Sequence, residues 1–314
     1  MRLRPGSQAL SSLGQAGWLV LGGVLAVLLL RAFSATLSAP LDADESLVWR
    51  GLQKLAQTGS LYGPPDHAVY TPLYYWISLP LVGLGPVGPR LLTTLCFGFV
   101  LAAWMALLRA WRNPALAGVL LAAACLHPDF LQWAHVLRVD MLGLALALWG
   151  LVLARRQSPW AFALLLLAFF TKQTLVAAAL AAYWRQPRRL ALFALSCGLG
   201  LALGAWLSQG WMARDLWGMA TEWSFAPMVF YLYLWPQEHP QLAMALLVAL
   251  ALPLLSRRWD ALAVYTLAGL GIALFGFAHR SGTNFLLEPT VAATFWLWTM
   301  ATGSAPLEPE PKPS

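Results

Sequence analysis

Long apolar runs separated by short polar segments dominate this chain. About ten runs have the continuity of helices: 17–38, 89–109, 114–127, 138–154, 159–171, 174–185, 189–208, 241–255, 260–278 and 285–301. Because a helix needs about 20 residues to cross a bilayer, the runs at 114–127, 159–171 and 174–185 require flanking residues, tilt or shielding by protein. The pattern predicts an all-α, polytopic membrane protein with one transmembrane domain, 1–302, and a disordered cytoplasmic tail, 303–314.

Two segments between the runs are long, 39–88 and 209–240. Within the first, 45–58 is amphipathic, which predicts a helix lying in the membrane interface and ended by Gly59. Residues 71–84 form a second, more apolar interfacial segment. The segment 209–240 is rich in Trp, Tyr and Phe, which indicates anchors at the headgroup level or, alternatively, residues that stack on a sugar.

Composition supports the membrane class. The mean hydropathy is +0.65, and 60% of the residues are hydrophobic while 11% are charged. The net charge of +7 comes from short basic clusters between the runs, so we expect it to reflect membrane topology and no nucleic-acid partner. Cys96, Cys125 and Cys197 all fall inside apolar runs, which indicates buried hydrophobes and neither disulfides nor a metal site.

The charges also predict an orientation. Arginine clusters recur in alternate loops, at 2/4, 109/112, 155/156, 185/188/189 and 257/258. By the positive-inside rule these loops are cytoplasmic, which puts both termini on the cytoplasmic side of a bacterial inner (plasma) membrane. Most carboxylates and all five histidines then fall on or near the outer side, so we expect the chemistry to face outward.

An acidic cluster follows the first run. Asp42, Asp44 and Glu45 occupy three of the four positions 42–45, at the start of the amphipathic segment. One interpretation is a helix cap by Asp42 or Asp44, because acids favour a helix N-terminus. The other is a general base, because crowding of carboxylates at a low-dielectric boundary raises at least one pKa.

Further polar residues lie at the outer ends of later runs. Asp140 suits the first turn of a helix, and Arg138 either pairs with it or holds an anion. Lys172 either snorkels to the interface or contacts a lipid phosphate. His279 and Arg280 open the segment His-Arg-Ser-Gly-Thr-Asn-Phe, which fits an oxyanion site or an ordinary polar turn.

Two points complete the candidate chemistry. Glu288 lies a few residues into the last run, where a lipid-facing carboxylate would be costly, so we expect it to face protein or a cavity. The histidines lack a metal-binding spacing, which leaves a divalent cation on Asp44, Glu45 and Asp140 as the one open possibility.

Several segments in order resemble the GT-C superfamily of polytopic glycosyltransferases, particularly bacterial relatives of protein O-mannosyltransferases and lipid A aminoarabinose transferases. The segments are Asp44-Glu45, Tyr70-Thr-Pro-Leu-Tyr-Tyr-Trp76, Pro89-Arg90-Leu-Leu, Arg138-Val-Asp140, Thr171-Lys172-Gln173 and Gly282-Thr-Asn-Phe-Leu-Leu-Glu-Pro289. The chain is short for the superfamily, and Thr71 stands where related sequences carry the first proline of a pair.

The resemblance implies sugar transfer from a polyprenyl-phosphate donor to a glycan, lipid or protein acceptor on the outer face. Under it, Asp44 is the base, and Glu45 or Asp140 orients the acceptor or holds a metal. The donor-phosphate candidates are Lys172, Arg138, His279 and Arg280, and the substrate-binding candidates are Tyr70, Tyr74, Asn284 and Glu288. Membrane lipid is the further expected partner.

Three other function classes stay open. A transporter or lipid flippase would place charges near mid-membrane in broken helices, whereas most charges here sit at run ends. A membrane acyl- or phosphotransferase would favour a histidine-centred motif, for which His127 or His135 is available. A non-catalytic membrane subunit would fit the short length.

Overall fold

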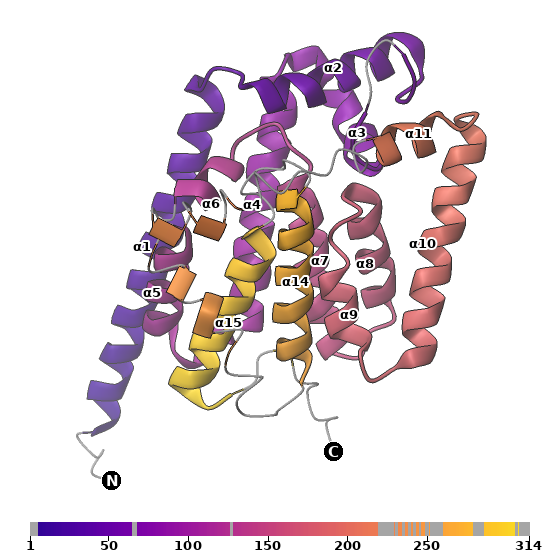
Figure 1. The fold of residues 1–314 in the computed structure, drawn as a ribbon. Coiled ribbons are helices and arrows are strands. Elements are labelled where there is room, and N and C mark those ends of the chain that lie inside the picture. Colours follow the sequence, from indigo (N-terminus) through magenta and orange to yellow (C-terminus); the bar gives the residue numbers. More distant parts are fainter. Residues whose placement is uncertain are drawn as a thin grey trace.

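The fold is seen in a computed structural model that describes residues 6–64, 68–125, 128–218, 260–278, 286–304, Leu307 and scattered positions between 229 and 251. Nine helices among these residues run along one bundle (Figure 1): α1 (Gly6–Ser38), α4 (Val87–Leu107), α5 (Pro114–Cys125), α7 (Asp140–Arg155), α8 (Trp160–Thr171), α9 (Ala177–Tyr183), α10 (Pro187–Leu207), α14 (Ala261–Ala278) and α15 (Leu287–Thr302). In the described ranges no residue is in a strand, so the all-α class is confirmed.

Short helices complete the architecture. At one end of the bundle lie α2 (Ala43–Thr58), α3 (Leu73–Ser78) and α11 (Trp211–Gly218) (Figure 1). The connections contain α6 (Pro128–Trp133) and the 3₁₀ helices η1 (Leu79–Leu84) and η2 (Ala110–Arg112). Hydropathy alone did not predict α6 and α11, because each is only about two turns or less and continues no apolar run.

The helix positions agree with the apolar pattern, although the number of membrane crossings stays a prediction. Among the described residues, three helices are long and apolar enough to cross a membrane: Gly14–Ser38 within α1, α4 and α10. The apolar helices Pro114–Cys125, Trp160–Thr171 and Ala261–Leu274 are shorter. The chain is therefore a membrane-associated helical protein. Of the expected run at 241–255 the structure describes positions 243, 244, 246–248 and 251, and these are helical.

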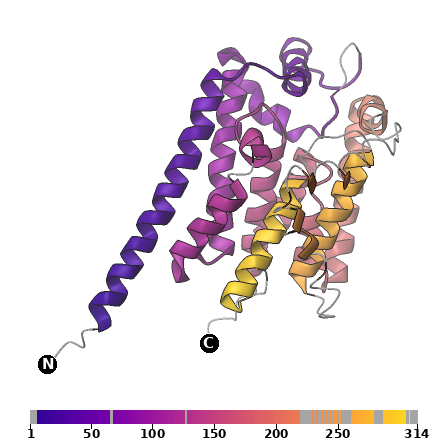
Figure 2. The same cartoon turned by 60° about the vertical axis from the view of Figure 1, so that its left-hand side comes forward.

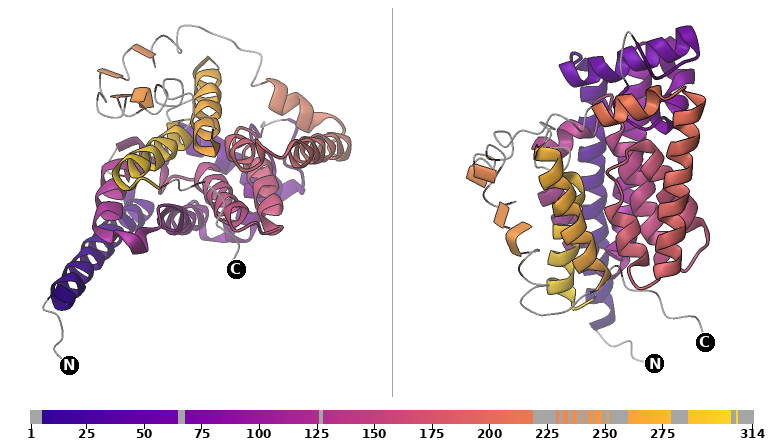
Figure 3. Two further views of the ribbon diagram at one scale, coloured as in Figure 1. Left: turned by 90° about the horizontal axis from the view of Figure 1, so that it is seen from below. Right: turned by 45° about the vertical axis from the view of Figure 1, so that its right-hand side comes forward.

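Apolar surface is concentrated on the two outermost helices. α1 and α10 lie at opposite edges of the bundle, and α1 diverges from it toward its N-terminus (Figures 1, 2 and 3). Only 22% of the apolar window of α1 and 11% of that of α10 is buried, compared with 56% for α4. Along α10 the exposed side chains recur at helical spacing: Leu192, Leu195, Leu199, Leu203, Trp206 and Leu207. Such a continuous apolar face fits contact with lipid.

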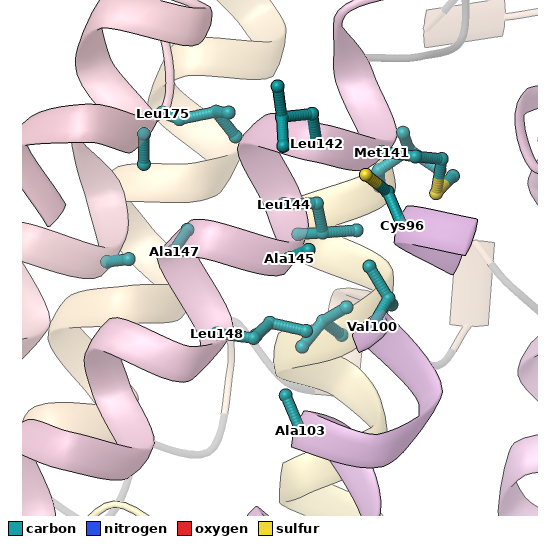
Figure 4. Close-up of a cluster of buried hydrophobic side chains, with 14 of the residues drawn as sticks. Cys96, Val100, Ala103, Met141, Leu142, Leu144, Ala145, Ala147, Leu148 and Leu175 are labelled. Carbon is teal, nitrogen blue, oxygen red and sulfur yellow. The ribbon is translucent and has the colours of Figure 1, made fainter. Parts of the chain in front are cut away.

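The core forms where α4 and α7 meet. Cys96, Val100 and Ala103 of α4 face Leu144 and Leu148 of α7 (Figure 4). The three cysteines are buried and free, as their place in apolar runs predicted. Small residues let α8 approach α7 closely: a Cβ on Gly150 would lie 2.7 Å from the side chain of Leu165. α7 is thus the central helix, and it carries Asp140 at its first position.

The amphipathic helix α2 forms where the pattern predicted it. Val48, Leu52 and Leu55 are buried, and a Cβ on Gly51 would lie 2.9 Å from the Tyr75 ring of α3. Gly59 ends the helix with φ of 69°, a left-handed conformation that glycine adopts without a Cβ penalty. α2 therefore packs closely against α3.

The two ends of the bundle differ. α1 begins and α15 ends at the end opposite α2, and the α7–α8 and α9–α10 turns lie there as well (Figure 1). These turns carry the arginine pair 155/156 and the triplet 185/188/189, which the positive-inside rule assigned to the cytoplasm. The acidic cluster and the arginine-rich turns thus occupy opposite ends of the molecule.

Candidate functional site

The Glu45 carboxylate is held by several hydrogen bonds within the fold. The α2 N-cap Asp42 accepts a 2.6 Å hydrogen bond from the Glu45 N–H, and the Glu45 carboxylate accepts one from the Asp42 N–H at 3.1 Å. Arg90 of α4 then donates from Nε to Glu45 Oε1 at 2.7 Å and from Nη2 to Oε2 at 2.5 Å. The Leu137 N–H also donates to Oε1, at 2.5 Å. The expectation that Asp42 caps the helix is confirmed.

The pKa of Glu45 follows from these contacts. Burial raises it, but Arg90 and the N–H groups of Leu137 and Asp42 outweigh burial, so the pKa lies below its usual value of 4.5. The acidic cluster was expected to contain a carboxylate with a raised pKa, and Glu45 is not that group. Its side chain is 1% exposed, so its role here is to connect α2, α4 and the turn before α7.

Asp44 lies beside Glu45 in sequence but in a different environment. Its side chain is 60% exposed, and its Oδ2 is 2.5 Å from Nη1 of Arg138. The two neighbours therefore differ in role. The Glu45 carboxylate is buried and bonded within the fold, while the Asp44 carboxylate is exposed beside the fixed Arg138 cation.

Arg138 is held by aromatic residues as well as by charge. Its guanidinium lies 4.8 Å from the ring centre of Trp133 and 5.6 Å from that of Tyr70. Nη2 donates to the Tyr70 hydroxyl at 2.5 Å, and Nε lies 3.6 Å from Asp140 Oδ2. Burial, Asp140 and Asp44 raise the pKa of Tyr70 to about 12 against the opposing effect of Arg138, so the phenol stays neutral.

Asp140 and Lys172 form the inner part of the site. Lys172 follows α8, at the break before α9, and its Nζ lies 2.6 Å from Asp140 Oδ1. Both side chains are buried, so Lys172 points into the protein and does not snorkel to the headgroups. Asp44, Arg138, Asp140 and Lys172 therefore form a row of alternating charges from the exposed surface to the interior.

Glu288 of α15 lies at the inner end of this row of charges, beside Asp140 and Lys172. It is buried in the first turn of α15 and, with Asp140 and Lys172, lines a cavity of about 10 Å³, close to the volume that one water needs. Tyr265 of α14 lies next to it. The expectation that Glu288 faces protein or a cavity is confirmed.

Other candidates are placed elsewhere. The Tyr74 side chain is fully buried between α3 and α4, with its hydroxyl 3.2 Å from Thr93 Oγ1, so it packs the fold and is not open to a substrate. His279, Arg280 and Asn284 lie outside the described residues.

No metal centre is assembled by the described part of the chain. It holds no group of three His, Cys, Asp or Glu side chains that could bind a metal ion. Each of the three candidate carboxylates faces a cation of the protein: Glu45 faces Arg90, Asp44 faces Arg138, and Asp140 faces Lys172 and Arg138.

Two parts of the site were missed from the sequence. Arg90 appeared only within a resembling segment, although an arginine one turn into an apolar run signals a buried acidic partner. Trp133 was missed because nothing in the sequence around α6 distinguishes it from the other aromatic residues.

A contact between α11 and the segment after α2 was also missed. Asp215 of α11 accepts a hydrogen bond from the Gly63 N–H at 2.9 Å, and Lys54 donates to the Gly63 carbonyl. These bonds hold α11 against the segment that follows α2.

The chain matches no family model, no curated protein and no solved structure. Chemically, the arrangement offers an accessible carboxylate, a guanidinium directly beside it that is 7% exposed, and a buried Lys–Asp pair behind them. That set suits proton removal beside a developing negative charge.

Proposed function

We propose that this protein is an integral membrane glycosyltransferase with a GT-C-like, ten-span fold. It moves a sugar from a polyprenyl-phosphate donor to an acceptor on the non-cytoplasmic face of a bacterial inner membrane. One observation carries the proposal: the exposed Asp44 carboxylate is paired with Arg138, which is itself backed by Asp140 and Lys172.

In the proposed reaction Asp44 takes the proton of the acceptor hydroxyl as its oxygen attacks the anomeric carbon. The bond from that carbon to the phosphate oxygen breaks, and the lipid phosphate leaves with the electron pair. Resemblance to the GT-C superfamily adds the expectation of inversion at the anomeric carbon. General-base help contributes about 10²–10⁴-fold to such steps.

Arg138 stabilises the departing phosphate in this scheme. It is the outermost cation of the row, and an arginine fork matches phosphate geometry. Lys172 lies behind it and is paired with Asp140, so its part is to keep Asp140 and Arg138 in place. His279 and Arg280 remain donor-phosphate candidates from the sequence alone, and Glu45 positions the helix that carries Asp44.

The test is transfer of radiolabelled sugar from defined polyprenyl-phosphate donors by purified protein. Asp44→Asn should lower the rate by about 10²-fold or more, the contribution of a general base. Asp42→Asn is the matched control, because it removes the same charge two positions away while asparagine still caps a helix. Wild-type rates in Asp44→Asn, or equal losses in both variants, would remove Asp44 as the base.

A transporter is the second candidate, favoured by the buried ionisable set Asp140, Lys172 and Glu288. Reconstitution in liposomes separates the two. Solute or lipid movement without sugar transfer from any donor would replace the transferase proposal.

A further inference from the structure

Tyr62 and Tyr70 lie in the segment between α2 and α3, and a hydrogen bond joins them. The Tyr62 hydroxyl donates to the Tyr70 carbonyl at 3.0 Å. Neither the GT-C resemblance nor the proposed reaction uses Tyr62. Its side chain is almost fully buried, so any effect of Tyr62 on the site passes through the residues that it contacts.

The orientation of the Arg138 guanidinium depends mainly on Tyr70. Nη1 pairs with Asp44, but that carboxylate is exposed and is free to turn toward an acceptor. Nε lies 3.6 Å from Asp140, beyond hydrogen-bonding distance, and has no hydrogen-bond partner in the described part of the chain. The Trp133 ring lies beside the guanidinium, but an indole offers no acceptor. Nη2 donates to the Tyr70 hydroxyl at 2.5 Å, which makes this bond the buried contact that orients the fork.

Tyr70 is itself held through its backbone. Its carbonyl accepts the Tyr62 hydroxyl, and the next residue, Thr71, donates from Oγ1 to the Phe169 carbonyl of α8 at 3.0 Å. Without the Tyr62 bond the backbone at Tyr70 would be fixed through Thr71 only, and the Tyr70 ring would be free to tilt. Such a shift matters at a reacting group, because a misplacement of about 1 Å costs up to about 10²-fold in rate.

The residue after Tyr62 is fixed by two helices. The Gly63 N–H donates to Asp215 of α11 at 2.9 Å, and Lys54 of α2 donates to the Gly63 carbonyl. Gly63 has a φ of 92°, and a Cβ added to it would lie 3.1 Å from the Trp211 ring of α11, so this close contact requires glycine. α2 and α11 therefore fix the position of Tyr62.

We propose that Tyr62 is a positioning residue for the transfer reaction. Its hydroxyl holds Tyr70, and Tyr70 holds the Arg138 guanidinium beside Asp44. The inference rests on the proposed function, in which Arg138 stabilises the departing lipid phosphate. It adds that the rate of transfer depends on a buried hydroxyl that α2 and α11 keep in place.

The test is Tyr62→Phe in the full chain, which removes one oxygen and keeps the ring. In the radiolabelled-sugar assay kcat should fall about tenfold, as expected for a misplaced catalytic group. The KM for the acceptor should not change, because Arg138 acts on the donor phosphate. Tyr75→Phe is the matched control. Tyr75 is fully buried in α3 and its hydroxyl has no hydrogen-bond partner among the described residues, so this variant should keep the wild-type rate.

A second measurement does not depend on sugar transfer. The Arg138 side chain is 7% exposed, and its modification by phenylglyoxal can be followed by peptide mass spectrometry. Tyr62→Phe should speed this modification about fivefold, the order set by one lost hydrogen bond. Arg90 is buried and bonded to Glu45, so its modification should keep the wild-type rate. An equal increase at both arginines would indicate general loosening and overturn the positioning role.

The route through Tyr70 is tested by a double variant. Tyr70→Phe removes the hydroxyl that Arg138 contacts. Tyr62→Phe with Tyr70→Phe should slow transfer less than the product of the two single effects, because both act through the same contact. Effects that multiply fully would overturn this route.

The outcomes separate this inference from the proposed function. Transfer and Arg138 modification at wild-type rates in Tyr62→Phe would overturn the positioning role and leave the transferase standing. Absence of transfer by the wild type with every donor would overturn the transferase. The modification rates would then decide by themselves whether Tyr62 holds Arg138.

Discussion

The neighbouring carboxylates Asp44 and Glu45, at the start of α2, point to opposite environments. Glu45 turns inward to Arg90 and the Leu137 N–H, whereas Asp44 turns outward to Arg138. The difference follows from helix geometry, because adjacent residues on a helix point about 100° apart and only one can face the bundle. Substitutions one position apart should therefore separate stability from activity.

Glu45→Gln should destabilise the protein by about 3–5 kcal/mol, because it leaves the buried Arg90 guanidinium without its counter-charge. The free energy of unfolding in mixed detergent micelles measures this. Asp44→Asn is the control and should leave that free energy nearly unchanged, since the Asp44 side chain is 60% exposed. Equal losses in the two variants would contradict the division of roles.

The lowered pKa of Glu45 predicts loss of stability in acid. A group with a lowered folded pKa stabilises the fold above its unfolded pKa, and this contribution disappears as the pH falls through the folded value. The loss should therefore begin near 4.5, the usual value for Glu, and continue below it. Unfolding free energies measured from pH 7 to pH 3 should fall more steeply for the wild type than for Glu45→Gln; parallel curves would argue against the Arg90 pairing.

At the scale of elements, close packing rather than propensity positions the site. Gly88 in the first turn of α4 lies against the Leu81 carbonyl of η1, and two residues later Arg90 reaches Glu45. Gly51 lets α2 approach α3 in the same way. A side chain at Gly88 would push η1 away from α4, and one at Gly51 would push α2 away from α3.

Gly88→Ala should therefore destabilise the protein by about 1–3 kcal/mol, because the added Cβ collides with backbone that cannot rotate away. The measurement is again the free energy of unfolding. Gly83→Ala in η1 is the matched control: a Cβ added at Gly83 would meet no atom within 4 Å, so stability should be unchanged or slightly higher. An unchanged Gly88→Ala protein would show that η1 moves freely against α4.

At the scale of the whole molecule, charge separates the two ends of the bundle. The acidic cluster with Arg138 lies at one end, and the arginine-rich turns around Arg155 and Arg185 lie at the other (Figure 1). Exposed apolar faces on α1 and α10 lie between them. This arrangement fits a protein that meets lipid at its sides and water at both ends.

The proposed orientation predicts opposite labelling at the two ends. In a background without Cys96, Cys125 and Cys197, Ser60→Cys should react with a membrane-impermeant maleimide in intact cells. Arg188→Cys should react only after permeabilisation, since the positive-inside rule places its turn in the cytoplasm. Both positions are exposed, so access to each depends on sidedness. The reverse pattern would invert the topology and place Asp44 inside the cell.

The sequence by itself determined the all-α class, the position of most helices and the amphipathic α2, and it left the cap of α2 to Asp42 or Asp44. These features follow from periodicity and local capping, which act over a few residues. It also brought forward Asp44, Arg138, Asp140 and Lys172 as candidates, but of their pairings it raised only Arg138 with Asp140, as one of two alternatives. Only the tertiary structure decided that Glu45 belongs to Arg90 and Lys172 to Asp140, because partners 45 and 32 residues apart meet only when helices pack.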